Sequence, residues 1–133
     1  LSETNVITEM KSLQGNMYIY STNSIHVMRL TGNVNIPVQF GPVTDEYGCL
    51  SRGSVMEYDG KHFVVGNNDL YTFSGNPGNI QSLSDGKIRE YFYNNLNPIH
   101  EAKMFTLLNH HENEIWVCYP TLASFMDHHL KLQ

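Results

Sequence analysis

The chain has 133 residues, a length that favours one domain with a substantial core. Only 16% of the residues are charged and the formal net charge is −5, so no basic face indicates nucleic acid as a main partner. The longest apolar runs are a few residues, too short for a membrane-spanning helix. Eight Tyr, six Phe and one Trp favour strands.

The first third of the chain has the pattern of a hairpin followed by loops. Residues 1–12 predict a lead-in, either helical or extended. Residues 17–22 and 25–30 predict two strands around a polar turn, with Tyr18 and Tyr20 on one face. Residues 31–54 are rich in loops, where Pro42 restricts any strand to the edge of a sheet. Pairing through Val38 and Phe40 at such an edge stays open.

Residues 55–73 predict a three-stranded meander. Strands at 55–58 and 62–65 flank Asp59-Gly60, a pair typical of a type I′ turn. A polar turn at 66–69 leads to a third strand at 70–73, and a loop follows as far as residue 86.

The second half contains the one predicted helix, at 87–96, with Ser84 or Asp85 as its cap. Its apolar stripe consists of Ile88, Phe92 and Leu96 and is widened by Tyr91. Strands are predicted at 103–108 and 115–119. The last dozen residues are predicted to form a short helix or a disordered tail.

A repeat with an offset of 45 residues underlies these elements. Residues 18–25 superimpose on 63–70, so that Asn23 meets Asn68 and Ser24 meets Asp69, and a weaker third copy begins near 114. A period of 40–50 residues built from antiparallel strands is typical of propeller blades, although similar hairpins also recur by chance. We therefore expect a mainly β fold of antiparallel meanders that resemble blades of a partial propeller, with one helix near 87–96.

The same repeat pattern predicts the domain organisation. We expect a single β-rich domain over 1–133, interpreted as a part of a longer chain. Its repeat-like units are expected at about 15–54, 55–108 and 109–133.

Four segments carry a resemblance to a known family. They are "YIYSTNSIHVM", "GCLSRGSVMEYDGKHFVVGNNDLYTFSG", "IREYFYNNLN" and "NEIWVCYPT", which together span roughly residues 15–121. Their order is similar to virion structural proteins of tailed bacteriophages, in the β-propeller-like part of the nozzle proteins called tail tubular protein B. The matching positions are Gly48, Ser54, Val55, Asp59, Gly60, Phe63, Leu70, Tyr71, Phe73, Gly75, Glu114, Ile115, Trp116, Tyr119 and Pro120.

The resemblance implies a structural role in the virion tail, assembled in the host cytoplasm, with copies of the chain and other virion proteins as partners. The final "TLASFMDHHLKLQ" departs from the family pattern, which continues with further strands. Closure of a full propeller is therefore left open. Uncovered blade edges invite pairing with another chain, so we expect a homo-oligomer.

Candidate chemistry is sparse. Two histidine clusters, 110–112 and 127–129, contain adjacent histidines, which point to opposite faces of a strand and seldom bind one ion together. The acid pairs at 45–46 and 112/114 lie in or beside turns and do not indicate a catalytic pair. Cys49 and Cys118 are expected as reduced thiols, with a disulfide left open. We expect no metal, no cofactor and no catalytic residue.

The residues expected to matter are packing or interface residues, because aromatic side chains that alternate along strands are usually core. They are Tyr18, Tyr20, Phe63, Leu70, Phe73, Phe92, Trp116 and Tyr119. The leading hypothesis is a non-enzymatic structural module of a phage virion, in or next to the tail. The alternative is a carbohydrate-binding or host-surface recognition module with exposed Tyr47 or Tyr93, and a third is a hydrolase on a propeller scaffold.

Overall fold

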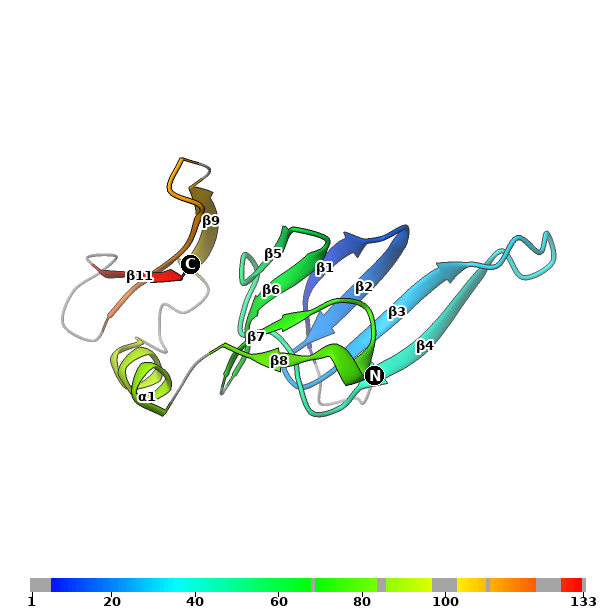
Figure 1. Ribbon diagram of the computed structural model, residues 1–133. Helices are drawn as coiled ribbons and strands as arrows, with labels where there is room; N and C mark the ends of the chain where they lie inside the picture. Colours follow the sequence, from blue (N-terminus) through cyan, green and yellow to red (C-terminus); the bar gives the residue numbers. More distant parts are fainter. Residues whose placement is uncertain are drawn as a thin grey trace.

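The computed structural model describes residues 6–67, 69–83, 86–96, 103–109, 111–121 and 128–132, of which 86–88 and 128–132 are described by their backbone alone. The chain forms three open antiparallel sheets and one α-helix (Figure 1). The mainly β fold and the single helix are therefore confirmed. The described residues do not close into a barrel or a ring.

Each sheet is a meander of consecutive strands. Sheet 1 consists of β1 (Ile7–Leu13), β2 (Asn16–Ser21), β3 (Ile25–Leu30) and β4 (Val38–Thr44). Sheet 2 consists of β5 (Val55–Tyr58), β6 (Lys61–Val65), β7 (Leu70–Phe73) and β8 (Gln81–Ser82), with a short 3-10 helix (Pro77–Asn79) before β8. Helix α1 (Gly86–Asn95) leads to sheet 3, which consists of β9 (Phe105–Asn109), β10 (Glu114–Tyr119) and β11 (His128–Leu132).

The predicted turns and the edge strand are present. Asp59 and Gly60 both have positive φ, 52° and 75°, as a type I′ turn requires between β5 and β6. Pro42 lies in β4, which pairs only with β3 and forms the edge of sheet 1. An edge strand tolerates proline because the missing N–H is not needed by a second neighbour.

The repeat read from the sequence holds in the backbone. The turn between β2 and β3 is closed by Ser21 N–H donating to Ser24 O at 2.9 Å, and the turn between β6 and β7 by Gly66 N–H donating to Asp69 O at 2.9 Å. These positions are 45 residues apart. Both hairpins join the second and third strands of their sheets, so the two copies occupy equivalent places.

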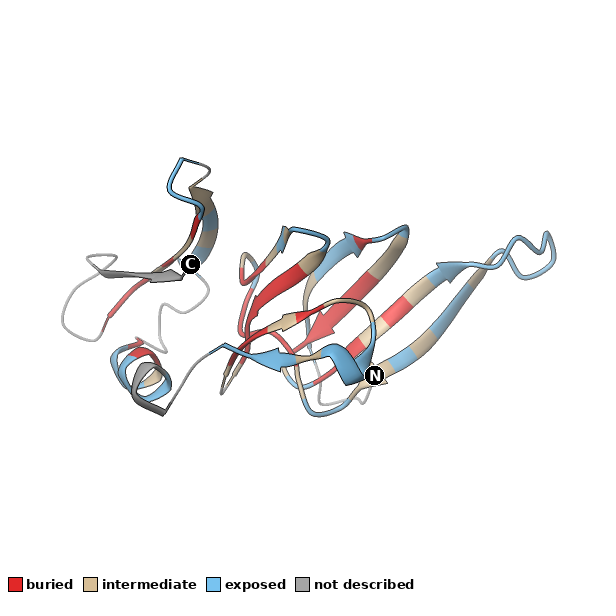
Figure 2. Cartoon of the chain, viewed as in Figure 1, coloured by how far each residue is buried: buried red, intermediate tan, exposed pale blue. Residues whose placement is uncertain are grey.

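Alternation along the strands builds two cores, one on each side of sheet 2 (Figure 2). Val64, Tyr71 and Phe73 face sheet 1 and pack in one cluster with Tyr18 and Tyr20. The other cluster joins the opposite face of sheet 2 to α1 and sheet 3 and consists of Leu50, Phe63, Val65, Leu70, Phe92, Leu96, Met104, Val117 and Tyr119. Sheet 2 is thus the middle layer of a stack.

The sheets also approach one another at their first strands, β1 against β5 and β5 against β9. Gly53, in the turn before β5, links all three. Its N–H donates to Glu9 Oε2 of β1 at 3.0 Å, and its carbonyl accepts from Thr106 N–H of β9 at 3.1 Å. The backbone at Gly53 has φ +88°, a conformation that glycine adopts without strain.

Several sequence predictions were wrong. The expected helix or disordered tail at the end contains β11, which pairs antiparallel with β10 from residue 128 to 132. The loop after β7 contains β8. Tyr91 does not widen the buried stripe of α1, because it is exposed. The expected caps Ser84 and Asp85 lie outside the described residues.

Candidate functional site

The interface between sheets 1 and 2 is built from aromatic side chains. Tyr18 meets Phe73 edge to face, with ring centroids 5.1 Å apart, and both are buried. Edge-to-face pairs gain stability beyond the area they bury. Tyr71 crosses from sheet 2 and donates its hydroxyl to Gly48 O at 2.7 Å. This interface fixes which face of sheet 1 is covered.

A buried polar chain runs through the same interface. His62 of β6 lies 2.8 Å from Ser12 O by its Nε2 and 2.7 Å from the Tyr20 hydroxyl by its Nδ1. Because the Ser12 carbonyl can only accept, Nε2 carries the proton and Nδ1 accepts from Tyr20. Burial lowers the pKa of His62 and raises that of Tyr20, so both are neutral at pH 7.

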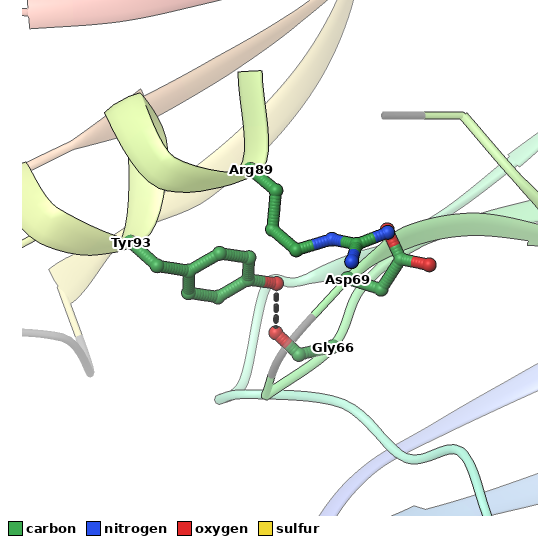
Figure 3. A network of polar contacts seen from close by, with 4 residues as sticks. All are labelled: Gly66, Asp69, Arg89 and Tyr93. Atoms are coloured by element: carbon green, nitrogen blue, oxygen red, sulfur yellow. Dashed lines mark hydrogen bonds and ion pairs between the residues drawn. The ribbon is translucent and has the colours of Figure 1, made fainter. Parts of the chain in front are cut away.

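The interface between sheets 2 and 3 is centred on α1. Phe92 is buried against Tyr119 of β10, with ring centroids 4.8 Å apart. Its neighbour Tyr93 donates its hydroxyl to Gly66 O at the start of the β6–β7 turn (Figure 3). Burial raises the pKa of Tyr93, which keeps the phenol protonated as a donor. Arg89 lies 3.6 Å from Asp69 beside this contact, as a partly exposed ion pair.

A small polar pocket lies where the turns of sheets 1 and 2 meet. Its volume is about 100 Å³, and its lining includes Asn23, Glu46, Tyr47, Asn67 and Asp69. Ligand pockets typically measure roughly 300–1,000 Å³, so this one has no room for a sugar ring with its contacts. Tyr47 packs against Tyr71 at 5.0 Å and is not an exposed platform. The two aromatics on which glycan binding would depend, Tyr47 and Tyr93, are therefore used within the fold.

Sheet 1 has a second face, which we call the front face, on the side away from sheet 2. It is formed by the side chains that alternate outward along the four strands: Met10, Ser12, Met17, Ile19, His26, Met28, Leu30, Val38, Phe40 and Pro42. None of them is Asp, Glu, Lys or Arg. Met10 is 47% exposed and Phe40 64% exposed. The front face is thus an apolar sheet surface on which Met10, Leu30 and Phe40 are exposed and Ile19, near its centre, is buried.

Sheet 3 has the corresponding rear face, on the side away from sheet 2. Trp116 and Cys118 of β10 pair with Leu107 and Phe105 of β9 on one side and, on the other side, with the register positions of Lys131 and His129 in β11. Phe105 and Leu107 are 42% and 39% exposed. Trp116 is half-buried on this face instead of packing between sheets 2 and 3. Its indole N–H donates to Glu114 Oε2 at 2.9 Å.

The structure places the predicted packing residues as follows. Tyr18, Tyr20 and Phe73 lie in the cluster between sheets 1 and 2, while Phe63, Leu70, Phe92 and Tyr119 lie in the cluster between sheet 2 and sheet 3. Only Trp116 lies outside both clusters. Sequence reasoning missed His62. Alternate residues of a strand share a face, so His62 lies on the same face as Val64, toward sheet 1. This alternation was the signal in the sequence that could have found His62.

The remaining ionisable groups are dispersed. Among residues 6–67, 69–83, 86–96, 103–109, 111–121 and 128–132, no three His, Cys, Asp or Glu side chains gather as metal ligands. His110, Asp127 and the side chains of His128 and His129 fall outside what is described. Both cysteines are free. Burial raises the pKa of Cys49 to about 11 and also raises that of Cys118, so both are thiols at neutral pH.

Comparisons with known protein sequences identify no family for the chain. No protein-family model matches the chain, and no curated protein sequence matches it significantly. Within the described part of the chain, no helix has the length and apolar character needed to cross a bilayer.

Proposed function

We propose that this chain is a non-enzymatic structural module of a tailed-phage virion, in the tail or next to it, which assembles in the host cytoplasm through its sheet faces. The observation that supports the proposal most directly is the exposure of large apolar side chains on two sheet faces. They are Met10, Leu30 and Phe40 on the front face of sheet 1, and Phe105 and Leu107 on the rear face of sheet 3. Large exposed apolar patches mark interaction sites. The assignment to a virion rests on the sequence resemblance to tail nozzle proteins.

The three sheets correspond, in this proposal, to blades of a partial propeller. Three features support it: each sheet is a meander, consecutive sheets stack face to face, and their first strands approach one another. Blades of a propeller are arranged in this way around an axis lined by their first strands.

The proposal is tested on purified particles of the phage whose genome encodes the chain. Quantitative mass spectrometry should find the chain in a fixed ratio to other tail proteins, and the ratio should survive washing in high salt, because burial of apolar faces is insensitive to ionic screening. The control is a phage lysate protein of similar size that is not part of the particle. Presence in the lysate together with absence from washed particles would refute the assignment.

A further inference from the structure

The face of sheet 2 that packs against sheet 3 changes from apolar to polar at one end. Its apolar part, which includes Phe63, packs with α1 and sheet 3. Lys61 alternates with Phe63 along β6, and Thr72 pairs with Phe63 on one side and with Gln81 on the other, so all of them share this face. Lys61 and Thr72 are half-buried, and β8, which carries Gln81, is exposed (Figure 2). The face therefore continues beyond its apolar core as a polar surface.

This polar surface is hollowed. A hollow of about 370 Å³ is lined by the same three polar residues and by Asp59, Gly60, Ser74 and Asn79. Its volume lies within the roughly 300–1,000 Å³ of ligand pockets. The lining side chains comprise one carboxylate, one ammonium group, two hydroxyls and two amides. An apolar ligand would cover these groups without giving them partners, so the hollow suits a ligand that both donates and accepts hydrogen bonds.

The polar side chains of this hollow are not used within the fold. Within the described part of the chain, no hydrogen bond or ion pair joins them to another residue; they are Asp59, Lys61, Thr72, Ser74, Asn79 and Gln81. The smaller pocket between the turns of sheets 1 and 2 differs, because Tyr71 there donates to Gly48 O and Asn67 donates to Thr22 O. The polar groups of the larger hollow are therefore free to bind a ligand.

The backbone around the hollow is held in place by hydrogen bonds. Gly60 lies in the type I′ turn, and Gln14 Nε2 of the β1–β2 turn donates to Gly60 O at 3.0 Å. Asn76 Oδ1 accepts from Gly78 N–H at 2.9 Å and caps the 3-10 helix that ends at Asn79. Groups carried by a fixed backbone lose little freedom when a ligand binds.

A second hollow, of about 490 Å³, adjoins the first, since Asp59 lines both. Its other lining residues are Glu57, Tyr58 and Leu108. The Tyr58 hydroxyl donates to Asn113 Oδ1, which fixes the position of the ring. We call the two hollows together the groove. It combines a polar part with an aromatic side chain, as the hydroxyl groups and the C–H face of a sugar ring require.

The charges of the groove favour a neutral ligand. Of the described residues that line it, Lys61 is the one cation, whereas Asp59 and Glu57 supply two carboxylates. An anion such as phosphate binds where cations are in excess, and here they are not. A calcium ion requires about six to eight oxygen ligands, and the ammonium group of Lys61 opposes it.

We propose that the groove binds a neutral, hydroxyl-rich oligosaccharide, with one sugar unit in the polar hollow and a neighbouring unit against Tyr58. Each sugar hydroxyl donates one hydrogen bond and accepts others, so it can bind the carboxylate, ammonium, hydroxyl and amide groups alike. Tyr47 and Tyr93 take no part in this site. The binding function goes beyond the structural role proposed above and does not depend on the virion assignment.

The test begins with the full chain on an array of neutral oligosaccharides that includes maltohexaose, cellohexaose and chitohexaose. The oligosaccharide that binds best is then titrated into the ¹⁵N-labelled chain and followed by two-dimensional NMR. We expect the amide signals of Gly60, Ser74 and Gln81 to shift on binding, and that of Val34, in the β3–β4 loop, to stay unchanged.

Matched variants locate the binding groups. Gln81→Ala is compared with Gln39→Ala, because both glutamines are exposed on edge strands, β8 and β4. Asp59→Asn is compared with Asp45→Asn; asparagine tolerates the positive φ of residue 59 and removes only the charge. Circular dichroism checks that the variants fold. We expect Gln81→Ala to weaken binding about fivefold and Asp59→Asn about tenfold, with each control within about twofold of wild type.

Other results overturn the inference. If no member of the array binds at about 1 mM, the groove is not a sugar site. If a sugar binds but Gln81→Ala and Asp59→Asn bind as their controls do, the sugar occupies another surface. If inorganic phosphate shifts the same amide signals and the sugars do not, the hollow is an anion site. None of these results bears on the virion assignment, which the particle measurement tests.

Discussion

Gly48 holds the loop after sheet 1 against the turn between β2 and β3, and its replacement by alanine should separate them. A Cβ atom at this position would lie 2.3 Å from Ser21 O and 2.5 Å from Thr22 C and O. All three are backbone atoms, so no side-chain rotation relieves the overlap. The φ angle of Gly48 is not in the left-handed region, so the cost is steric.

The expected loss follows from the contacts that must give way. Forcing extra volume into a packed site costs about 1–3 kcal/mol. The bonds from Cys49 N–H to Ser21 O, 2.9 Å, and from the Tyr71 hydroxyl to Gly48 O, 2.7 Å, weaken as the segments part. Each such bond contributes about 0.5–1.5 kcal/mol. Alanine also reduces the conformational entropy of the unfolded chain, which stabilises the fold by about 0.4–1 kcal/mol. The net loss in the free energy of unfolding is then about 3 kcal/mol.

Urea denaturation followed by far-ultraviolet circular dichroism measures the free energy of unfolding. Gly41→Ala is the control, because its Cβ would meet only Val27 Cγ1 at 4.0 Å and its φ is also outside the left-handed region. We expect Gly41→Ala to change stability by less than about 0.5 kcal/mol, because the position is only half-buried and the added Cβ overlaps no neighbour. Equal, small effects of the two alanines would refute the close approach of the loop to sheet 1.

Three more predictions test the links between the sheets. Gly53→Ala should cost more than Gly32→Ala, since both have positive φ but only the first places a Cβ 3.1 Å from a backbone oxygen, and thermal melts compare them. Stability should fall as the pH drops below about 6.5. Burial lowers the pKa of His62 in the fold, so the unfolded chain binds a proton there that the folded chain does not. A His62→Gln variant should show a smaller dependence of stability on pH. Tyr93→Phe should lower the free energy of unfolding in urea by about 1 kcal/mol and Arg89→Gln by under about 0.5 kcal/mol, because a partly buried hydrogen bond contributes more than an ion pair whose arginine is half exposed.

Local patterns predicted much of the fold. Alternation along 17–30 and 55–73, with Asp59-Gly60 between two strands, depends only on neighbouring residues and turn chemistry, and the structure has these hairpins. The residues of β11 carry no comparable signal. His128–Leu132 becomes a strand because β10 offers it a free edge, which is a tertiary effect that no window of sequence contains.

The faces of the sheets were predictable only in part. Alternation places Tyr18 and Tyr20 on one side of β2, but it does not say which sheet covers that side. Trp116 illustrates the limit, since aromatic residues in strands are usually core, and this one lies half-buried on the rear face. Tyr91 and Tyr93 illustrate it for α1, where the helix packs with Tyr93 inward and leaves Tyr91 exposed.

The residue types of the front face suit a surface that would meet a partner only after the chain has folded. At the equivalent positions of sheet 2, Tyr71 and Phe73 require partners at fixed angles, and sheet 1 of the same chain supplies them. The front face instead holds three of the six methionines, Met10, Met17 and Met28. Methionine is unbranched and adapts its side chain to an irregular neighbour. A face that meets its partner only after folding gains from such adaptability, because a small mismatch in docking then leaves fewer voids than rigid rings would.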